Sequence, residues 1–449
     1  MSQQRRHHRP AASTTNPAQA GLTGRPNRLP SASLAELVEL AAARAAEPTS
    51  SPARRASAAS SPSRPPSAAR PDPIAAPRLA RLAGSPQTTT GLEFVANPIG
   101  TLTDVEPQAV AVSYWFTAPA GTTRHRVSVR FTGHRLDVIG ARSPGDDFVA
   151  TEDVADVAPD SGPIAVTHRI TGTTPGRWAV TAEALALPHG ADKSALVRLP
   201  TASGTGRSVY APIARTRAPG VVLGAWPAMV GLGFVLALLV QGLLARVHGL
   251  TEGRVVMLAL LAGVLGLLGA KTYYWLTHLR ERIEAATWLA GLSVQGFVAV
   301  ATAVFILGGW WWGVPVGHLL DASIPALLTG QAVGRLGCLL AGCCSGLPTR
   351  SHWAIWSSDR HIGTRRVPVQ LLESSSAALL ALVTGLIAWQ AAPERAGLLF
   401  AAGVAAYVLV RQVLFPLRGL PRATRHGRAV MLVLAPVVLA GSIAGALFA

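Results

Sequence analysis

Residues 334–349, with the sequence GRLGCLLAGCCSGLPT, combine reactive side chains with an apolar setting. One arginine, three cysteines and four glycines lie in a segment that is otherwise hydrophobic enough for a membrane. On a continuous helix, Arg335, Cys338, Gly342 and Gly346 would recur at steps of three or four and share one face. A charge at the bilayer centre costs at least about 2.5 kcal/mol, so such residues usually line a cavity and contact a ligand or partner. The spacing therefore predicts a cationic face, lined by small residues, that admits a lipid headgroup.

An alternative explanation of the same stretch needs no ligand. Arg335 could extend its side chain to water at the membrane surface, beside a helix-packing seam of the GxxxG type formed by the pairs Gly330/Gly334 and Gly342/Gly346. The residue types alone leave both interpretations open.

Further polar residues interrupt the apolar segments, and the sequence predicts that some of them share the site. Tyr407 and Arg411 lie four residues apart and so occupy one helix face. Two arginines could clamp one phosphate through charge-assisted, bidentate hydrogen bonds, a geometry that lysine cannot supply. Lys271 lies near the end of its segment, where extension to the membrane surface is the simpler explanation. The remaining candidates are Gln295, Gln331, Gln370 and Glu373.

The three cysteines, Cys338, Cys343 and Cys344, form no disulfide framework, because all lie in one predicted membrane segment. A zinc site would need a fourth ligand, and the nearby His352 and His361 do not give the spacing of a standard site. We therefore predict no metal and no other cofactor.

Apolar segments of about twenty residues recur in the second half of the chain and predict a polytopic helical bundle. Seven such segments fit a hydrocarbon core about 30 Å thick. The loops between them are short except the one at residues 345–369, which can lie over the site. Trp310, Trp311 and Trp312 indicate an aromatic belt at the membrane interface. The predicted spans are 221–244, 255–276, 288–309, 318–341, 370–391, 396–416 and 429–448.

The first half of the chain predicts two further units. Residues 1–90 are a tract rich in Ser, Pro, Ala and Arg that cannot bury enough apolar area to fold, apart from one short amphipathic island at 34–41. Residues 91–216 show short alternating runs separated by turn residues, which is typical of an immunoglobulin-like β-sandwich with a binding or positioning role. Its predicted strands are 92–99, 110–117, 126–132, 136–141, 164–170, 178–185 and 209–213. Residues 217–449 form the membrane unit.

The net charge of +17 indicates an anionic partner. The positive charge is concentrated in residues 1–90 and in the second half, whereas acidic and basic residues balance within 91–218. No zinc finger or RNA-binding aromatic motif accompanies it, so we predict anionic phospholipid and no nucleic acid.

The stretch 334–349 resembles the signature of the prolipoprotein diacylglyceryl transferase family, GRxGCFxxGCCxGxPT, followed by a tryptophan and a Pro-x-Gln-Leu-x-Glu element. Here these are Trp353 and residues 368–373, PVQLLE. The resemblance covers roughly residues 221–420 and implies a bacterial inner-membrane enzyme. Such an enzyme moves diacylglycerol from phosphatidylglycerol to a cysteine thiol of a lipoprotein precursor and releases glycerol phosphate.

The resemblance implies roles for particular residues. Arg335 and Arg411 would bind and stabilise phosphate, and Glu373 would orient an arginine or take the thiol proton. Gln295 stands where many members have histidine and Phe415 where glutamate is usual, so the alternative is a lipid-binding scaffold without transfer activity. The expected substrate-binding residues are Trp226, Lys271, Gln295, Cys338, Gly346, Gln370 and Tyr407.

The two signals for membrane orientation disagree. Loops predicted on the side of the N-terminus hold most of the arginines, which by the positive-inside rule indicates the cytoplasm. The family resemblance implies that this side faces outward. Because arginines that bind phosphate bias the count, we expect the outward orientation, with residues 91–216 on the same face as the 345–369 loop.

Overall fold

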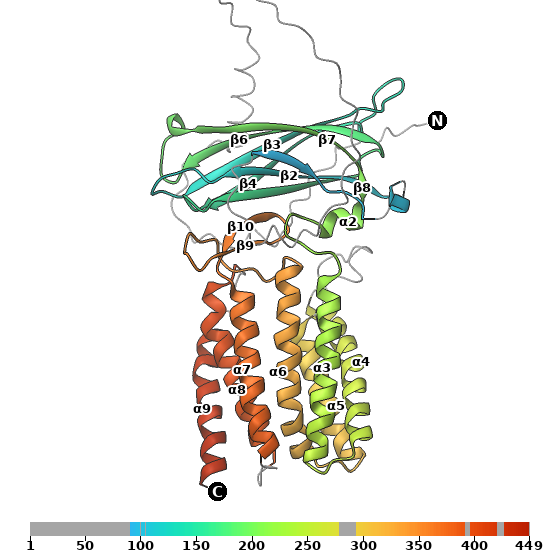
Figure 1. The fold of residues 1–449 in the computed structure, drawn as a ribbon, viewed down its shortest axis with the longest axis vertical. Helices are drawn as coiled ribbons and strands as arrows, with labels where there is room; N and C mark the ends of the chain where they lie inside the picture. Colours follow the sequence, from blue (N-terminus) through green and yellow to red (C-terminus); the bar gives the residue numbers. More distant parts are fainter. Residues whose placement is uncertain are drawn as a thin grey trace, which may run out of the picture.

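The structure is a computed structural model that describes residues 90–98, 100–103, 105–277, 293–390, 396–419 and 426–448. A β-rich region stands above one end of a helical bundle, and the chain ends at the opposite end of that bundle (Figure 1). The predicted tail at 1–90, with its amphipathic island at 34–41, lies outside the described residues except for residue 90.

The β-rich region, residues 91–210, consists of two antiparallel sheets. One sheet has the order β1-β2-β5, with β8 also pairing with β2, and the other has the order β4-β3-β6-β7. Alternating side chains such as Val112, Phe131 and Trp178 point between the sheets and are fully buried in one hydrophobic core. The strands are β1 Gly91–Phe94, β2 Gln108–Thr117, β3 His125–Arg135, β4 Asp147–Val157, β5 Pro163–Thr171, β6 Arg177–Pro188, β7 Val197–Arg207 and β8 Val209–Tyr210.

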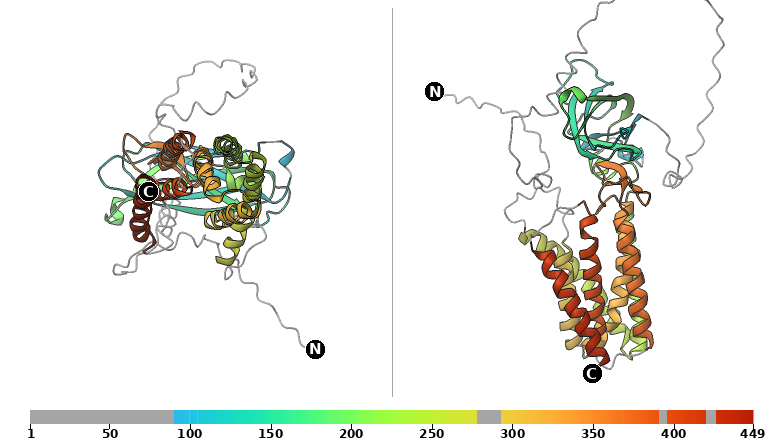
Figure 2. Two further views of the ribbon diagram at one scale, coloured as in Figure 1. Left: turned by 90° about the horizontal axis from the view of Figure 1, so that it is seen from below. Right: turned by 90° about the vertical axis from the view of Figure 1, so that its left-hand side faces the viewer.

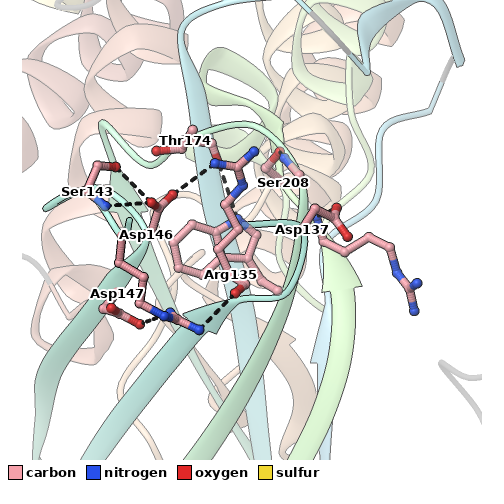
Figure 3. Close-up of polar contacts among 11 residues, drawn as sticks. Arg135, Asp137, Ser143, Asp146, Asp147, Thr174 and Ser208 are labelled. Carbon is pink, nitrogen blue, oxygen red and sulfur yellow. Dashed lines mark hydrogen bonds and ion pairs between the residues drawn. The ribbon is translucent and has the colours of Figure 1, made fainter. Parts of the chain in front are cut away.

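One of the predicted strands, 136–141, was wrong, and another, 209–213, was too long. Residues 136–141 belong to the loop between β3 and β4, and residues 211–213 begin the short helix α2, Ala211–Thr216. The loop is closed by the Asp146 carboxylate, which accepts hydrogen bonds from the Ser143 backbone N–H and hydroxyl, both at 2.8 Å, and from Arg135 at 2.9 Å (Figure 3). These local bonds favour a turn over a strand, because they satisfy polar groups that a sheet would otherwise pair.

The membrane unit contains seven described helices that run between its two ends (Figures 1 and 2). Among the described residues, five helices are long and apolar enough to cross a membrane: α3, α4, α7, α8 and α9. The seven predicted spans therefore reduce to five on this criterion, because α5 is short in its apolar part and α6 carries Asp321 and Arg335. The helices are α3 Ala225–Val247, α4 Glu252–Thr277, α5 Val294–Trp311, α6 Val316–Leu340, α7 Val369–Gln390, α8 Leu398–Leu414 and α9 Gly427–Leu447.

Helix α6 occupies the centre of the bundle and packs against α3, α7 and α8. Gly330 and Gly337 lie on its face toward α3, where an added Cβ would meet backbone atoms of Gly233 and Trp226 at 3.2 and 3.4 Å. Gly334 contacts nothing at its Cβ position, so the seam predicted at Gly330/Gly334 was wrong in its second member. The close approach of α3 and α6 nevertheless rests on glycines, as in other membrane helix pairs.

Helix α6 ends within one residue of its predicted span, 318–341, so the continuous helix assumed for Gly342 and Gly346 is wrong. The helix ends at Leu340, and Gly342 adopts a left-handed φ of +64°. Gly342 and Gly346 therefore do not continue the helical face of Arg335 and Cys338. A glycine just past a helix end is the usual residue for a left-handed termination.

The loop at 345–369 contains a hairpin that joins the β-rich region. Its strands are β9 Ile355–Ser358 and β10 Ile362–Arg366, and β10 pairs antiparallel with β5 through Ile362 opposite Val166 and Gly363 opposite Ala165. The first sheet thus reads β1-β2-β5-β10-β9 and includes strands from both halves of the chain. The expectation that the β-rich region and this loop lie on one face is confirmed (Figure 1).

Candidate active site

A buried group of charges lies where α6, α7 and the end of α8 meet beneath the hairpin. The Nε of Arg335 on α6 lies 2.9 Å from Oε2 of Glu373 on α7. The Nη2 of Arg418, just beyond α8, lies 3.4 Å from the same oxygen. The side chains of Glu373 and Arg418 are each only 2% exposed and that of Arg335 is 9% exposed. One carboxylate therefore faces two guanidinium groups out of reach of bulk water.

A second layer of hydrogen bonds holds this group in place. The side-chain amide of Gln331, one turn before Arg335, orients its oxygen to accept from Arg335 Nε at 2.8 Å and from the Tyr407 hydroxyl at 2.6 Å. The Gln370 amide, 1% exposed, donates to the Cys343 backbone carbonyl at 3.1 Å. These bonds connect α8 to α6 through Gln331, and α7 to the segment after α6 through Cys343.

The charges in this group do not cancel. Two guanidinium groups and one carboxylate leave an excess of one positive charge in a buried setting. Among the described residues, Glu373 Oε1 and Arg418 Nε are buried without a hydrogen-bond partner. Buried polar atoms are almost always paired, and an exception calls for a bound species or a function. The arrangement is suited to an anion that accepts from guanidinium donors.

The three cysteines converge beside these charges. Their sulfur atoms lie within 4.8 Å of one another, and Cys344 takes a left-handed φ of +54°, which is uncommon for a residue with a side chain. Three thiols could hold a soft metal ion, whereas structural zinc takes a fourth ligand. The absence of a metal stays a prediction.

Gly346 serves through its lack of a side chain. An added Cβ would come within 2.2 Å of the Val367 carbonyl oxygen, so only glycine permits the close pairing of these two segments. Its own carbonyl accepts from Arg366 Nη1 at 3.1 Å, and its backbone forms a bridge with Arg418. Gly346 therefore helps to fix the position of Arg418.

Arg411 does not pair with Glu373. It is partly exposed on α8, and no ion pair links it to a carboxylate within the described residues. Arg418 is the second guanidinium beside Glu373, a role that the sequence did not predict, and the phosphate-binding role expected of Arg411 stays a prediction.

The remaining predicted residues lie at the same end of the bundle but outside the charged group. The backbone of Trp226 packs against Gly337, and its side chain is 38% exposed. The Nζ of Lys271 lies 5.7 Å from the ring centroids of Tyr274 and Trp275 on its own helix, and its extension to the membrane surface stays a prediction. Gln295 lies in the first turn of α5, and its side chain is outside what the structure describes.

The family model described as prolipoprotein diacylglyceryl transferase matches residues 216–446, which includes every helix from α3 to α9. The phosphatidylglycerol–prolipoprotein diacylglyceryl transferase of Clostridium tetani is 27% identical over 214 residues, covering 45% of this chain and 84% of that protein.

Two further relatives bear the same description. The second such enzyme of Clostridium perfringens is 30% identical, covering 29% of this chain and 54% of that protein. The enzyme of Rhodococcus jostii is 29% identical, covering 36% of this chain and 48% of that protein. The chain thus spans most of the first relative and about half of these two, and strands β1 to β8 precede the matched family region.

Proposed function

This chain belongs to the prolipoprotein diacylglyceryl transferase family, and from that premise we propose that the Arg335–Glu373–Arg418 group is its phosphatidylglycerol headgroup site. The protein is a multi-pass bacterial membrane transferase. It moves diacylglycerol from phosphatidylglycerol to the cysteine thiol of a lipoprotein precursor.

The observation that carries the proposed site is the uncancelled positive charge of a buried group at one end of the bundle. A phosphodiester carries one negative charge, which matches the excess, and offers oxygens to guanidinium donors such as the unpartnered Arg418 Nε. Desolvation strengthens each of these contacts relative to the same contact in water. Arg411, partly exposed on the neighbouring helix, extends the cationic surface toward the incoming lipid.

The reaction makes definite demands on these residues. A carbon–sulfur bond forms between the acceptor cysteine and the diacylglycerol moiety, while the carbon–oxygen bond to phosphate breaks. The thiol proton passes to Glu373 or to the departing glycerol phosphate. Negative charge grows on the departing glycerol phosphate, where Arg335 and Arg418 stabilise it. Glu373 is the residue that orients both guanidinium groups, since one of its oxygens contacts both.

The other predicted residues take supporting roles in this proposal. Tyr407 and Gln370 position the charged group through Gln331 and Cys343. Trp226, Lys271 and Gln295 lie on helices that flank it and would contact the lipid.

We also propose the finer architecture: seven spans, α3 to α9, an immunoglobulin-like β-sandwich at 91–216, and a membrane unit at 217–449. What supports seven spans is that α5 and α6 run between the same two ends of the bundle as the five apolar helices (Figure 1). The polar residues of α6 lie against neighbouring helices, where a spanning helix can accommodate them.

The site is tested by anionic-lipid binding and by transfer to a peptide that carries a lipoprotein cleavage-site cysteine. The purified proteins are wild type, Arg335→Lys, Arg335→Ala and Arg411→Ala, with Arg428→Ala as the matched control. Arg428 on α9 donates to the Gln412 carbonyl and is outside the site. Thermal melting checks that each variant folds.

We expect wild type and Arg428→Ala to transfer diacylglycerol and both Arg335→Ala and Arg411→Ala to lose transfer. Loss of a charge-assisted contact should weaken phosphatidylglycerol binding by about 1.5–3 kcal/mol, and lysine should restore it only in part. Lipid binding without transfer in every protein would indicate a scaffold. Unchanged lipid binding in folded Arg335→Ala would refute the proposed headgroup site.

A further inference from the structure

The β-rich region contacts the segment that closes the active site. Beyond the β10–β5 ladder, the Thr167 backbone N–H donates to the His361 carbonyl at 2.7 Å. The Trp356 ring of β9 stacks on Trp115 of β2, with centroids 5.4 Å apart and planes 15° apart, and its Nε1 donates to the Pro163 carbonyl at 2.9 Å. Strands β2 and β5 precede the family match at 216–446. A region outside the family match therefore supports a loop inside it.

A chain of hydrogen bonds continues from β5 to the end of α6. The guanidinium of Arg169 on β5 donates to the carbonyls of Ala214, Arg217 and Arg360, at 2.5, 2.9 and 2.6 Å. Arg360 in turn donates from Nε to the Ala341 carbonyl at 2.8 Å. Ala341 is the C-cap residue of α6, six residues after Arg335.

The geometry of this chain is specific. Arg360 adopts a left-handed φ of +77°, a conformation that persists for such a side chain only where the surroundings impose it. An added Cβ on Gly342 would lie 2.9 Å from the Ser358 carbonyl, so the hairpin packs directly on the turn after α6. A change in the position of the hairpin is therefore transmitted to that turn.

A buried arginine is a costly way to hold the β-rich region and the hairpin together. Its burial, followed by the positive charge of Arg360, lowers its pKa to about 10. The fold thus holds a cation where the charged form is disfavoured, and an apolar contact would join the two regions without that penalty. What the guanidinium adds is direction, since its fixed fork reaches three carbonyls from two segments, the end of α2 and the turn between β9 and β10.

We propose that Arg169 and Arg360 are positioning residues: through them, the β-rich region fixes the turn at residues 341–349 and so sets the geometry of the Arg335–Glu373–Arg418 group. The consequence for transfer rests on the proposed function; the consequence for the turn does not. In this proposal the β-rich region contributes to the geometry of the active site and is not only an attached domain.

The experiment uses the full chain in nanodiscs that contain phosphatidylglycerol. Arg169→Met and Arg360→Met keep most of the apolar stem and remove the donors, and they interrupt the chain of hydrogen bonds at its two ends. Arg124→Met is the matched control, because it removes an exposed arginine that pairs with Asp156 in the same region. Hydrogen exchange of residues 341–349 and 355–366 is measured together with kcat and KM for transfer.

We expect both variants to speed amide exchange in 341–349 and to lower kcat by about tenfold to a hundredfold, the effect of a misplacement near 1 Å. KM for phosphatidylglycerol and the exchange of the membrane helices should change little. Arg124→Met should behave as wild type.

Two outcomes would overturn the proposal. Unchanged exchange in 341–349 in both variants would mean that the turn holds its position without β5. Faster exchange with a wild-type kcat would mean that the contact is only structural. If wild type itself shows no transfer, the proposed function fails, while the exchange measurement still decides whether β5 positions the turn.

Discussion

Glu373 is in contact with two guanidinium groups, and this contact organises the site at the scale of single residues. Arg335 and Glu373 could be identified from the sequence because each interrupts an apolar segment, where a charge needs a reason. The position of Arg418, rather than Arg411, beside Glu373 could not be predicted from the sequence. Helical spacing shows which residues share a face but not which face meets α7. That position depends on how α8 ends: the chain turns through Phe415–Leu417 and brings Arg418 inward.

A double-mutant cycle measures this assignment. Arg418→Gln and Glu373→Gln are combined, and the free energy of unfolding is compared with the two single variants. Because the two side chains are in contact and buried, we expect a coupling of at least about 1 kcal/mol. The matched cycle of Arg411→Gln with Glu373→Gln should give less than about 0.5 kcal/mol. Equal coupling in the two cycles would contradict the role assigned to Arg418.

The cysteines lead to a second prediction at this scale. Because the acceptor thiol comes from the lipoprotein precursor, Cys338, Cys343 and Cys344 should serve packing and not nucleophilic attack. A variant with all three changed to alanine should fold, with a lower melting temperature from lost packing, and should keep part of its transfer activity. Complete loss of transfer in a well-folded variant, with a metal or a covalent lipid found on the native protein, would reverse this assignment.

At the scale of elements, the sequence predicted most of the strong strands and all of the long apolar helices. It missed β4 and β7, because β4 lies at a sheet edge, holds four acidic residues and alternates exposed with half-buried side chains, and β7 is rich in Ser, Thr and Gly. It also missed the β9–β10 hairpin, since a hairpin that docks on a sheet from the other half of the chain leaves no local sign of that partner. Long-range pairing of this kind is set by tertiary contacts.

The loop between β3 and β4 gives a prediction about pH. Hydrogen bonds from the Ser143 backbone and then from Arg135 hold the pKa of Asp146 well below its usual range. A lowered carboxyl pKa stabilises the fold above the unfolded value of about 3.9, and this contribution is lost as pH falls toward the folded value. Asp146→Asn should therefore melt below wild type at pH 7, and the difference should shrink below about pH 4.

The control for this measurement is Asp156→Asn, which removes an exposed ion pair with Arg124. Exposed pairs contribute little, so its melting temperature should stay close to that of wild type at every pH. A gap between wild type and Asp146→Asn that is constant from pH 7 to pH 3 would show that the loop is not stabilised by the ionised carboxylate.

At the scale of the whole molecule, the structure weakens the positive-inside signal, which placed the N-terminal side of the membrane unit in the cytoplasm. Four of the arginines counted toward a cytoplasmic N-terminal side are engaged in the fold. Arg366 pairs with Asp359, Arg418 with Glu373, and Arg360 and Arg365 donate to backbone carbonyls. Charges held in this way are selected for structure or for ligand binding, so they are poor indicators of which side is retained in the cytoplasm.

The orientation is tested by labelling single engineered cysteines with a membrane-impermeant thiol reagent in intact cells. Ser203 on β7 and Ser351 in the 345–369 loop are exposed at one end of the molecule, and Thr251, between α3 and α4, is exposed at the other. Because β10 pairs with β5, Ser203→Cys and Ser351→Cys must give the same result, and seven spans with an outward site predict that both are labelled. Thr251→Cys should be labelled only after the cells are permeabilised, and wild type, whose cysteines are buried or half-buried, sets the background.

Labelling of Thr251→Cys alone in intact cells would place the site on the cytoplasmic side and reverse the orientation expected here. Labelling of only one of the two serine variants would contradict the pairing of the β-rich region with the 345–369 loop in one sheet.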